Sequence, residues 1–158
     1  MWNHEPPGYA CPFCLLQREV HDERNQADDV VAVTRLAFAR ISPTWWPANH
    51  GHALVIPRGH HENLYHLPPE THHAVVDLVQ AVAVAIRASY GCDGVSTRQH
   101  NEPSGGQDVW HLHVHVFPRY DGDRLYERQP EARAASAHER KPYADRLAAA
   151  LGMPRTFG

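Results

Sequence analysis

The chain of 158 residues has only three cysteines, and it lacks both a long apolar run and a long run of basic residues. So few cysteines, in an odd number, exclude a disulfide framework. The missing apolar run excludes a membrane-spanning helix, and the first residues show no secretory signal. The net charge of −3 argues against nucleic acid as the main partner. We therefore expect a soluble, cytoplasmic protein with neither a nucleic-acid nor a membrane partner.

Histidines occupy every second position of one segment, at His111, His113 and His115. Side chains two residues apart diverge on a helix but point the same way on a strand. The positions between and beside them are all apolar, namely Trp110, Leu112, Val114 and Val116. The pattern predicts a strand with one buried face and a row of imidazoles on the other.

Three interpretations of this row of histidines are open. The histidines could be unrelated structural residues, although strict alternation opposite an apolar face disfavours this. They could bind a catalytic metal, as in zinc hydrolases that activate a water molecule. The third interpretation is nucleophilic catalysis, in which a neutral imidazole attacks phosphorus and a neighbouring imidazole assists the leaving oxygen. We prefer the third, because the turn at Gly105-Gly106 could also present backbone N–H groups to a phosphate.

Apolar runs bounded by proline and glycine predict the other elements. We expect strands over residues 30–33, 36–41, 53–56, 94–99 and 109–117. A long helix is expected from Pro68-Pro69 to Gly91. The tail is predicted as a surface appendage with a short helix over residues 143–151. We divide the chain into a first domain, residues 1–126, and a C-terminal helical extension, residues 127–158.

Cys11 and Cys14 have the two-residue spacing of a zinc knuckle, which predicts either a metal site or a reduced dithiol. A closed tetrahedral metal site needs two further ligands. A redox function is disfavoured, because no strand-motif-helix pattern surrounds Cys11. Cys92 is predicted to be an ordinary packed thiol.

Several linked motifs resemble the histidine triad (HIT) superfamily. The segment 111–117, His-Leu-His-Val-His-Val-Phe, is similar to the alternating histidine signature of that superfamily. Asn101 with Gly105-Gly106-Gln107 is similar to its Asn…Gly-Gln segment, and residues 51–58 are similar to its Gly-His-x-Leu-Val-Ile-Pro-Lys strand. The Cys-x-x-Cys opening recurs in many members. The resemblance spans roughly residues 9–120, and the tail lies outside it.

The resemblance implies an α+β, HIT-like fold with an antiparallel sheet of about five strands and one long helix, followed here by a C-terminal helical tail. Members are usually homodimers. It also implies a nucleotidyl hydrolase or transferase that acts on a phosphoanhydride or phosphoramidate of a nucleoside monophosphate through a nucleotidyl-histidine intermediate. The alternatives are a nucleotide-binding or scaffold protein with little catalysis, and a metallohydrolase that uses zinc-bound water.

The same resemblance assigns functions to individual residues. His113 is the expected nucleophile, His115 contacts the phosphate or the leaving-group oxygen, and Gln107 orients that oxygen. The expected substrate-binding positions, which include His52 as a partner of the triad, are Asn101, Gly105, Gly106, Asp108, His52, Arg40 and Ile41.

Two positions depart from the family pattern. Asp108 stands where relatives usually carry Ser or Thr, and a carboxylate there repels a phosphate unless it is turned away or paired. Arg40 stands where many relatives carry an acceptor for the ribose hydroxyls, and a guanidinium offers no acceptor. These departures indicate a leaving group or sugar unlike that of an ordinary purine nucleoside phosphoramidase. The long loop with Trp45-Trp46 is expected to form or cover the substrate pocket.

The resemblance also implies how the metal site is completed. Zinc-bearing members use a histidine after the Leu-Val-Ile-Pro strand, here His60 with His61 as the alternative, and the first histidine of the triad, here His111. We therefore predict a structural Zn²⁺ whose ligands are Cys11, Cys14, His60 and His111. This assignment leaves the two later histidines of the triad for chemistry.

Overall fold

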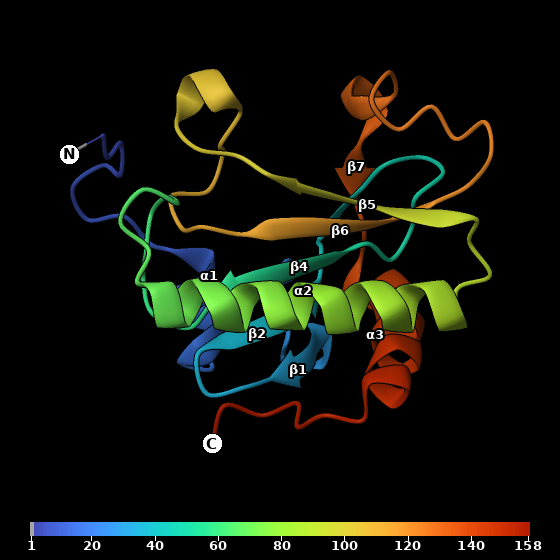
Figure 1. Ribbon diagram of the computed structural model, residues 1–158, viewed down its shortest axis with the longest axis horizontal. Helices are drawn as coiled ribbons and strands as arrows, with labels where there is room; N and C mark the ends of the chain where they lie inside the picture. Colours follow the sequence, from blue (N-terminus) through green and yellow to red (C-terminus); the bar gives the residue numbers. More distant parts are fainter. Residues whose placement is uncertain (1) are drawn as a thin grey trace.

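The computed structural model describes residues 2–158 and is built on a five-stranded antiparallel sheet in the order β1-β2-β4-β6-β5 (Figure 1). Its strands are β1 Val30–Val33, β2 Ala37–Ile41, β4 Ala53–Pro57, β5 Gly94–Gln99 and β6 Val114–Arg119. A second, two-stranded sheet pairs β3 Thr44–Trp45 with β7 Arg133–Ala134. The helices are α1 Pro12–Gln17, α2 Pro69–Ser89 and α3 Ala137–Leu151, and three 3₁₀ turns are η1 Ala27–Asp29, η2 Pro103–Gly105 and η3 Gln129–Glu131. The expected α+β architecture is confirmed.

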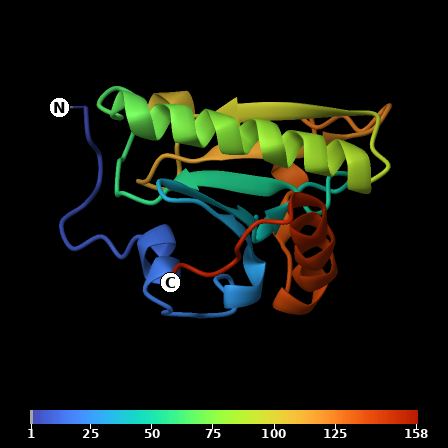
Figure 2. The ribbon, with the colours of Figure 1, turned by 60° about the horizontal axis from the view of Figure 1, so that its bottom comes forward.

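Helix α2 covers one face of the sheet (Figures 1 and 2). Its buried residues Val75, Leu78, Val82 and Ile86 recur at intervals of three and four, so they form one stripe along the helix. They pack against the inward side chains of the strands, such as Val55 of β4. Burying each such side chain stabilises the fold by roughly 1.5–3 kcal/mol. None of the described helices is both long and apolar enough to cross a bilayer.

The opposite face of the sheet carries the candidate site. Successive residues of a strand point to opposite faces, so Phe38 and Leu54 face away from α2 while Ala39 and Val55 face toward it. Phe38 and Leu54 belong to a smaller apolar cluster with Phe13 of α1. The short helix α1 is thus held against this second face, where its Phe13 ring contacts the rings of His111 and His113.

The C-terminal tail is part of the core, and the prediction of a surface appendage is wrong. Helix α3 begins earlier than predicted, because Ser136 accepts a hydrogen bond from the Glu139 N–H while the Glu139 carboxylate accepts one from the Ser136 N–H. Ala144, Leu147 and Ala148 are buried in the same cluster as α2. Their spacing makes an apolar stripe that packs on α2 and β1.

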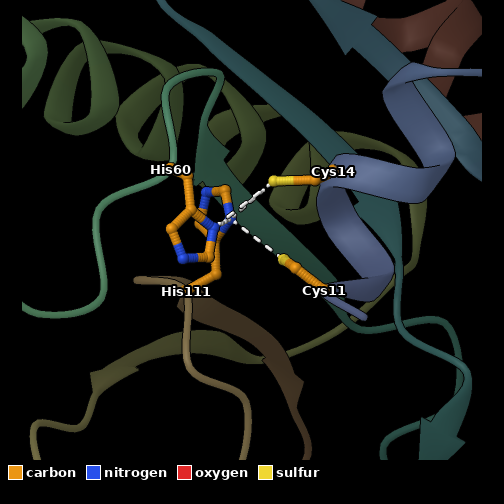
Figure 3. A group of neighbouring side chains, drawn as sticks. All are labelled: Cys11, Cys14, His60 and His111. Atoms are coloured by element: carbon orange, nitrogen blue, oxygen red, sulfur yellow. Dashed lines mark hydrogen bonds between the residues drawn. The ribbon is translucent and has the colours of Figure 1, made fainter. Parts of the chain in front are cut away.

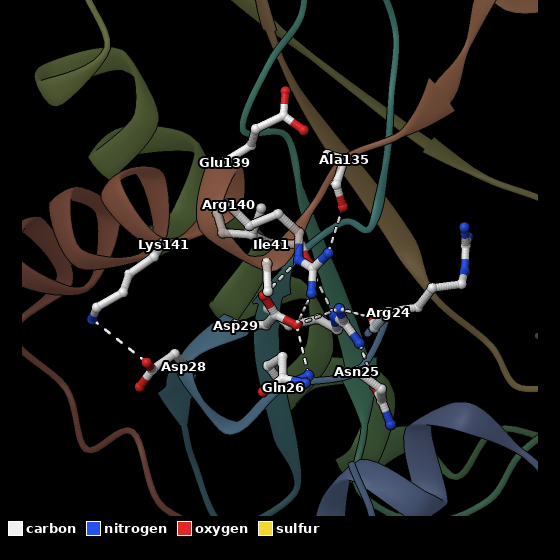
Figure 4. A network of polar contacts seen from close by, with 12 residues as sticks. Arg24, Asn25, Gln26, Asp28, Asp29, Ile41, Ala135, Glu139, Arg140 and Lys141 are labelled. Atoms are coloured by element: carbon white, nitrogen blue, oxygen red, sulfur yellow. Dashed lines mark hydrogen bonds and ion pairs between the residues drawn. The ribbon is translucent and has the colours of Figure 1, made fainter. Parts of the chain in front are cut away.

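A buried ion-pair network ties α3 to the first strands (Figure 4). The carboxylate of Asp29 accepts hydrogen bonds from Arg140 Nε at 2.7 Å and from Arg40 Nη2 at 2.9 Å. All three side chains are almost fully shielded from solvent. Arg140 also donates to the carbonyls of Ala135 and Glu23, so its guanidinium is well satisfied. The network joins residues more than 100 positions apart in the sequence.

The strand that carries the histidines is shorter than predicted. β6 begins at Val114, so His111 and His113 precede it. The His111 N–H donates to the Val109 carbonyl, and the Leu112 N–H donates to the His61 carbonyl at 2.7 Å. These bonds replace the ladder bonds that a strand would need, so the segment before Val114 is fastened to the loop after β4 instead of to a neighbouring strand.

Candidate functional site

His113 is held in one tautomer by a backbone hydrogen bond. Its Nδ1 lies 2.8 Å from the carbonyl oxygen of His111. A carbonyl only accepts, so Nδ1 must carry the proton and Nε2 must carry a lone pair whenever the ring is neutral. Burial lowers the pKa of His113, which favours the neutral ring. The residue therefore presents an unprotonated nitrogen, as a nucleophile requires.

The immediate surroundings of His113 are an aromatic edge and a carboxylate. The ring of Phe13 meets that of His113 edge-on with centroids 5.4 Å apart. Asp108 Oδ1 lies 3.8 Å from His113 Nε2, and the Asp108 side chain is 83% exposed. This carboxylate therefore faces solvent beside the reactive nitrogen, and among the described residues His113 is the one basic side chain within 4 Å of it.

His115 is backed by a buried histidine and two aromatic rings. His115 Nδ1 lies 3.4 Å from His52 Nε2, and the two rings stack. His52 is completely buried, and burial lowers its pKa to about 3, so it is neutral at physiological pH. The ring of Trp46 packs edge-on against His52 and Phe117. His52 thus lies behind the triad and sets the position of the His115 ring.

The prediction that the Trp45-Trp46 pair forms or covers the substrate pocket is wrong, because neither indole lines the cavity that reaches His113 and His115, and both are buried elsewhere in the protein. The Trp45 indole N–H donates to the Ser42 carbonyl, and its ring packs on Tyr143 of α3. Gly51, which precedes His52, has φ +77° and lies so close to Tyr143 that a Cβ would fall 2.2 Å from the ring. The tail therefore shapes the loop that leads into the site.

A cavity of about 230 Å³ opens on this face of the sheet and reaches His113 and His115. Leu54, Arg40 and Asp108 also line it. Most of the remaining lining comes from α1, the segment 22–25 and the residues after β2. The two later triad histidines thus border a cavity that a substrate can enter.

Arg40 lines the cavity, but its guanidinium is committed to the protein. It donates to the Ile41 and Arg24 carbonyls, to Asn25 Oδ1 at 2.5 Å and to Asp29 Oδ2 at 2.9 Å. Arg40 therefore fixes the segment 24–25 as a wall of the cavity. Ile41 does not line the cavity: its side chain is buried on the α2 side, because neighbours on a strand face opposite ways.

The glycine turn does not offer the amide groups that the sequence predicts. The N–H groups of Gly105, Gly106 and Gln107 all donate to carbonyls within the turn itself. The side chain of Gln107 donates to the Glu62 and Val109 carbonyls and accepts from the Glu102 N–H. In this arrangement the side-chain amide of Gln107 braces the loop, and its role in orienting a leaving oxygen stays a prediction.

Asn101 is likewise engaged by the protein. Its Oδ1 accepts from the Leu64 N–H at 2.8 Å and from Gln99 Nε2 at 2.9 Å, and it does not line the cavity. Asn101 joins the end of β5 to the loop after β4. Of the expected substrate-binding residues, Arg40 and Asp108 reach the cavity, whereas Asn101, the two glycines, His52 and Ile41 do not.

Cys11, Cys14, His60 and His111 converge on one point (Figure 3). Their Sγ and Nδ1 atoms all lie within 4.8 Å of one another. The two Nδ1 atoms are 3.2 Å apart, and the sulfur–nitrogen separations include 3.3, 3.4 and 3.7 Å. For a tetrahedral Zn²⁺ with ordinary bond lengths, the expected edges are about 3.4 Å for nitrogen–nitrogen and about 3.6 Å for nitrogen–sulfur. The alternative ligand His61 is not in the cluster.

The hydrogen bonds of the two histidines explain why their Nδ1 atoms are ligands. His111 Nε2 lies 2.9 Å from the Pro57 carbonyl, and His60 Nε2 lies 2.5 Å from Glu5 Oε2. Both Nε2 atoms therefore carry the proton, and both Nδ1 atoms of the neutral rings carry lone pairs. Two lone pairs facing each other at 3.2 Å repel unless a cation lies between them. This is the arrangement that histidine ligands of zinc normally have.

Known proteins resemble this chain in sequence and in fold. The family model described as "HIT domain" matches residues 23–122. "Protein hit" of Bacillus subtilis (strain 168) is 34% identical over 111 residues, 70% of this chain and 71% of that protein. "Adenylylsulfatase HINT3" of Arabidopsis thaliana is 34% identical over 80 residues, 51% of this chain and 41% of that protein.

A solved structure described as a Zn-bound histidine triad family protein from Mycobacterium smegmatis is 28% identical to this chain, with a TM-score of 0.73. The match covers 90% of this chain and 94% of that one. The family model spans more than half of the described protein, from the segment that walls the cavity to the end of the histidine strand. The chain belongs to the HIT domain family.

Proposed function

We propose that this protein is a nucleotidyl hydrolase or transferase that forms a covalent bond between His113 and the phosphorus of a nucleoside monophosphate. The observation that carries the proposal is the hydrogen bond from His113 Nδ1–H to the His111 carbonyl, which leaves Nε2 free beside the cavity. The HIT family membership and the relative named adenylylsulfatase support a substrate with an activated nucleotidyl group.

The proposed reaction has two displacements. In the first, the lone pair of His113 Nε2 forms a bond to phosphorus, and the bond from phosphorus to the leaving group breaks with its electron pair. His115, whose ring centroid lies 5.1 Å from that of His113, contacts the leaving atom. In the second, water or another acceptor attacks phosphorus, the nitrogen–phosphorus bond breaks, and the nucleoside monophosphate is released. The cavity holds the bound substrate next to His113, so the attack on phosphorus is a step within one complex and no longer a collision between two molecules.

We also propose that Cys11, Cys14, His60 and His111 bind a structural Zn²⁺. Four protein ligands close a tetrahedral site, so none of its positions is left for a catalytic water. When bound, the ion joins α1 to the segment before β6 and thereby fixes the His111 carbonyl that orients His113. The closed ligand set disfavours the metallohydrolase alternative.

The zinc proposal is tested by metal content and thermal stability. Cys14→Ser should abolish stoichiometric zinc, measured by plasma mass spectrometry on protein purified from zinc-supplemented cells. It should also lower the Tm by about 10 °C, which corresponds to a loss of about 3 kcal/mol at this size. Cys92→Ser, outside the cluster, is the matched control and should retain one zinc per chain. A wild-type protein that carries no zinc, or a Cys14→Ser protein that carries as much, would rule the site out.

We further propose that the protein is a homodimer. β5 lies at one edge of the sheet, and an edge strand leaves backbone N–H and C=O groups that a second copy can pair with. Light scattering coupled to size exclusion measures the mass directly, and a monomeric mass at micromolar concentration would contradict the proposal.

A further inference from the structure

Four side chains form one row across the sheet, on the face of the candidate site. Arg40 of β2 is the Cα partner of Leu54 on β4, which pairs with His115 on β6, which in turn pairs with Arg98 on β5. Directly paired residues project to the same face of a sheet, with Cβ atoms about 4.5–5.5 Å apart. His115 therefore has the cavity on one side, toward Leu54, and Arg98 on the other.

Within residues 2–158, Arg98 is a cation that forms no direct ion pair, and the carboxylate that influences it is that of the exposed Asp108. Its guanidinium carbon lies 5.3 Å from the ring centroid of Trp46 and 5.2 Å from that of Phe117. These are the rings that pack on His52, and the Phe117 ring also stacks on His115. Among the described residues no carboxylate forms an ion pair with Arg98, and its buried Nε has no hydrogen-bond partner.

Arg40, at the other end of the row, differs from Arg98 in having its charge neutralised by the protein. The charge of Arg98 is available to a ligand. Arg40 donates four hydrogen bonds to protein acceptors, and one of these acceptors is the buried carboxylate of Asp29. Arg98 donates no hydrogen bond to the described residues, although a buried polar group without a partner costs free energy. Aromatic faces steady a guanidinium without using its N–H groups. The guanidinium of Arg98 is thus oriented beside His115, and its N–H groups are available to bind an anion.

We propose that Arg98 binds an anionic leaving group, so that the preferred substrate is a mixed anhydride between a nucleoside monophosphate and an oxyacid such as sulfate or phosphate. This inference rests on the proposed function above. When Nε2 of His113 bonds to phosphorus, the bridging phosphorus–oxygen bond breaks and its electron pair stays on the departing oxyanion. Sulfate leaves as a dianion and needs no proton, so a fixed cation beside the leaving oxygen is what stabilises its departure. A departing amine, by contrast, must take up a proton.

The test compares two substrates that share the adenylyl group and differ in the leaving group. Adenosine 5′-phosphosulfate releases sulfate, and adenosine 5′-phosphoramidate releases ammonia. The readout is the ratio of their kcat/KM values, sulfate over amine. Arg98→Gln is expected to lower this ratio about 10- to 100-fold, as expected for the loss of a charge-assisted contact in the transition state. Arg98→Lys, which keeps the charge, should restore part of it.

Arg146→Gln is the matched control, because Arg146 also lies over two aromatic rings, those of Tyr90 and Tyr143, away from the site. The control should keep the wild-type ratio. If Arg98→Gln slows both substrates equally, or changes the oligomeric state with no change in the ratio, Arg98 supports the packing of Trp46 or an interface and the inference is wrong. Wild-type protein that forms no adduct and turns over neither substrate would defeat the proposed function, and this inference with it.

Discussion

His113→Asn is expected to lower kcat/KM for an adenylyl substrate by about 10⁴-fold or more while the protein keeps its fold. Asparagine can still donate its side-chain N–H to the His111 carbonyl, so the hydrogen bond that orients residue 113 survives. What it lacks is the second nitrogen with a lone pair. Product release followed by chromatography gives the rate, and circular dichroism with a Tm measurement shows whether the fold is retained.

The matched control for this prediction is His73→Ala, on the exposed surface of α2, which should leave kcat/KM within about twofold of wild type. Retention of a tenth or more of wild-type activity by His113→Asn would show that another group attacks phosphorus. Loss of the fold would be seen in the melting curve, and His113→Gln would then be used as a second variant.

Asp29→Ala should destabilise the protein by about 3–5 kcal/mol, the usual cost of removing one partner from a buried ion pair. The carboxylate of Asp29 is the shared acceptor of Arg40 and Arg140, and its removal leaves two buried guanidiniums without their counterion. The loss should also loosen the segment 24–25 at the cavity wall, because Arg40 holds that segment in place. Urea denaturation measures the free energy of unfolding.

The neighbouring residue provides the control for the Asp29 prediction. Asp28 is exposed and lies 3.5 Å from Lys141, so Asp28→Ala should cost only about 0–1 kcal/mol. If the Asp29→Ala protein is as stable as the Asp28→Ala protein, the two arginines have found water or other acceptors. The ion-pair network would then not be the contact that joins the tail to the sheet.

The sequence predicted those features whose physical cause is local. Strict alternation of His111, His113 and His115 with apolar residues indicated that His113 and His115 project to the same side, and both line the cavity although only His115 lies on the strand. The Cys-x-x-Cys spacing, together with the family resemblance, pointed to the histidines that lie beside Cys11 and Cys14 in the structure. The long helix α2 followed from its apolar stripe and the glycine after it.

Other features depend on contacts that no local pattern reveals. The pairing of Arg140 with Asp29 spans 111 positions, so nothing near either residue showed that the tail belongs to the core. The side chains of Gln107 and Asn101 bond to a loop about 40 residues away, which a motif cannot show. Glu5, which holds the His60 ring, was missed for the same reason.

One signal in the sequence was present and was not used, whereas the position of Arg98 could not be read from the sequence. Ile41 follows Arg40 on a strand, so alternation alone places the two side chains on opposite faces. Arg98 lies on β5, and its place beside His115 requires the pairing register of β5 with β6. Alternation would have excluded Ile41 from the pocket, whereas Arg98 needed the structure.

The central claim is that a nitrogen of His113 bonds covalently to phosphorus during turnover. The most direct measurement is the intact mass of the protein after brief mixing with an adenylyl substrate and an alkaline quench, because histidine–phosphorus bonds are labile in acid. We predict one added adenylyl group per chain, which peptide mapping assigns to His113 and which is absent from His113→Asn. An adduct on any other residue, or product formed in a single turnover with no adduct at the shortest times, would contradict the account.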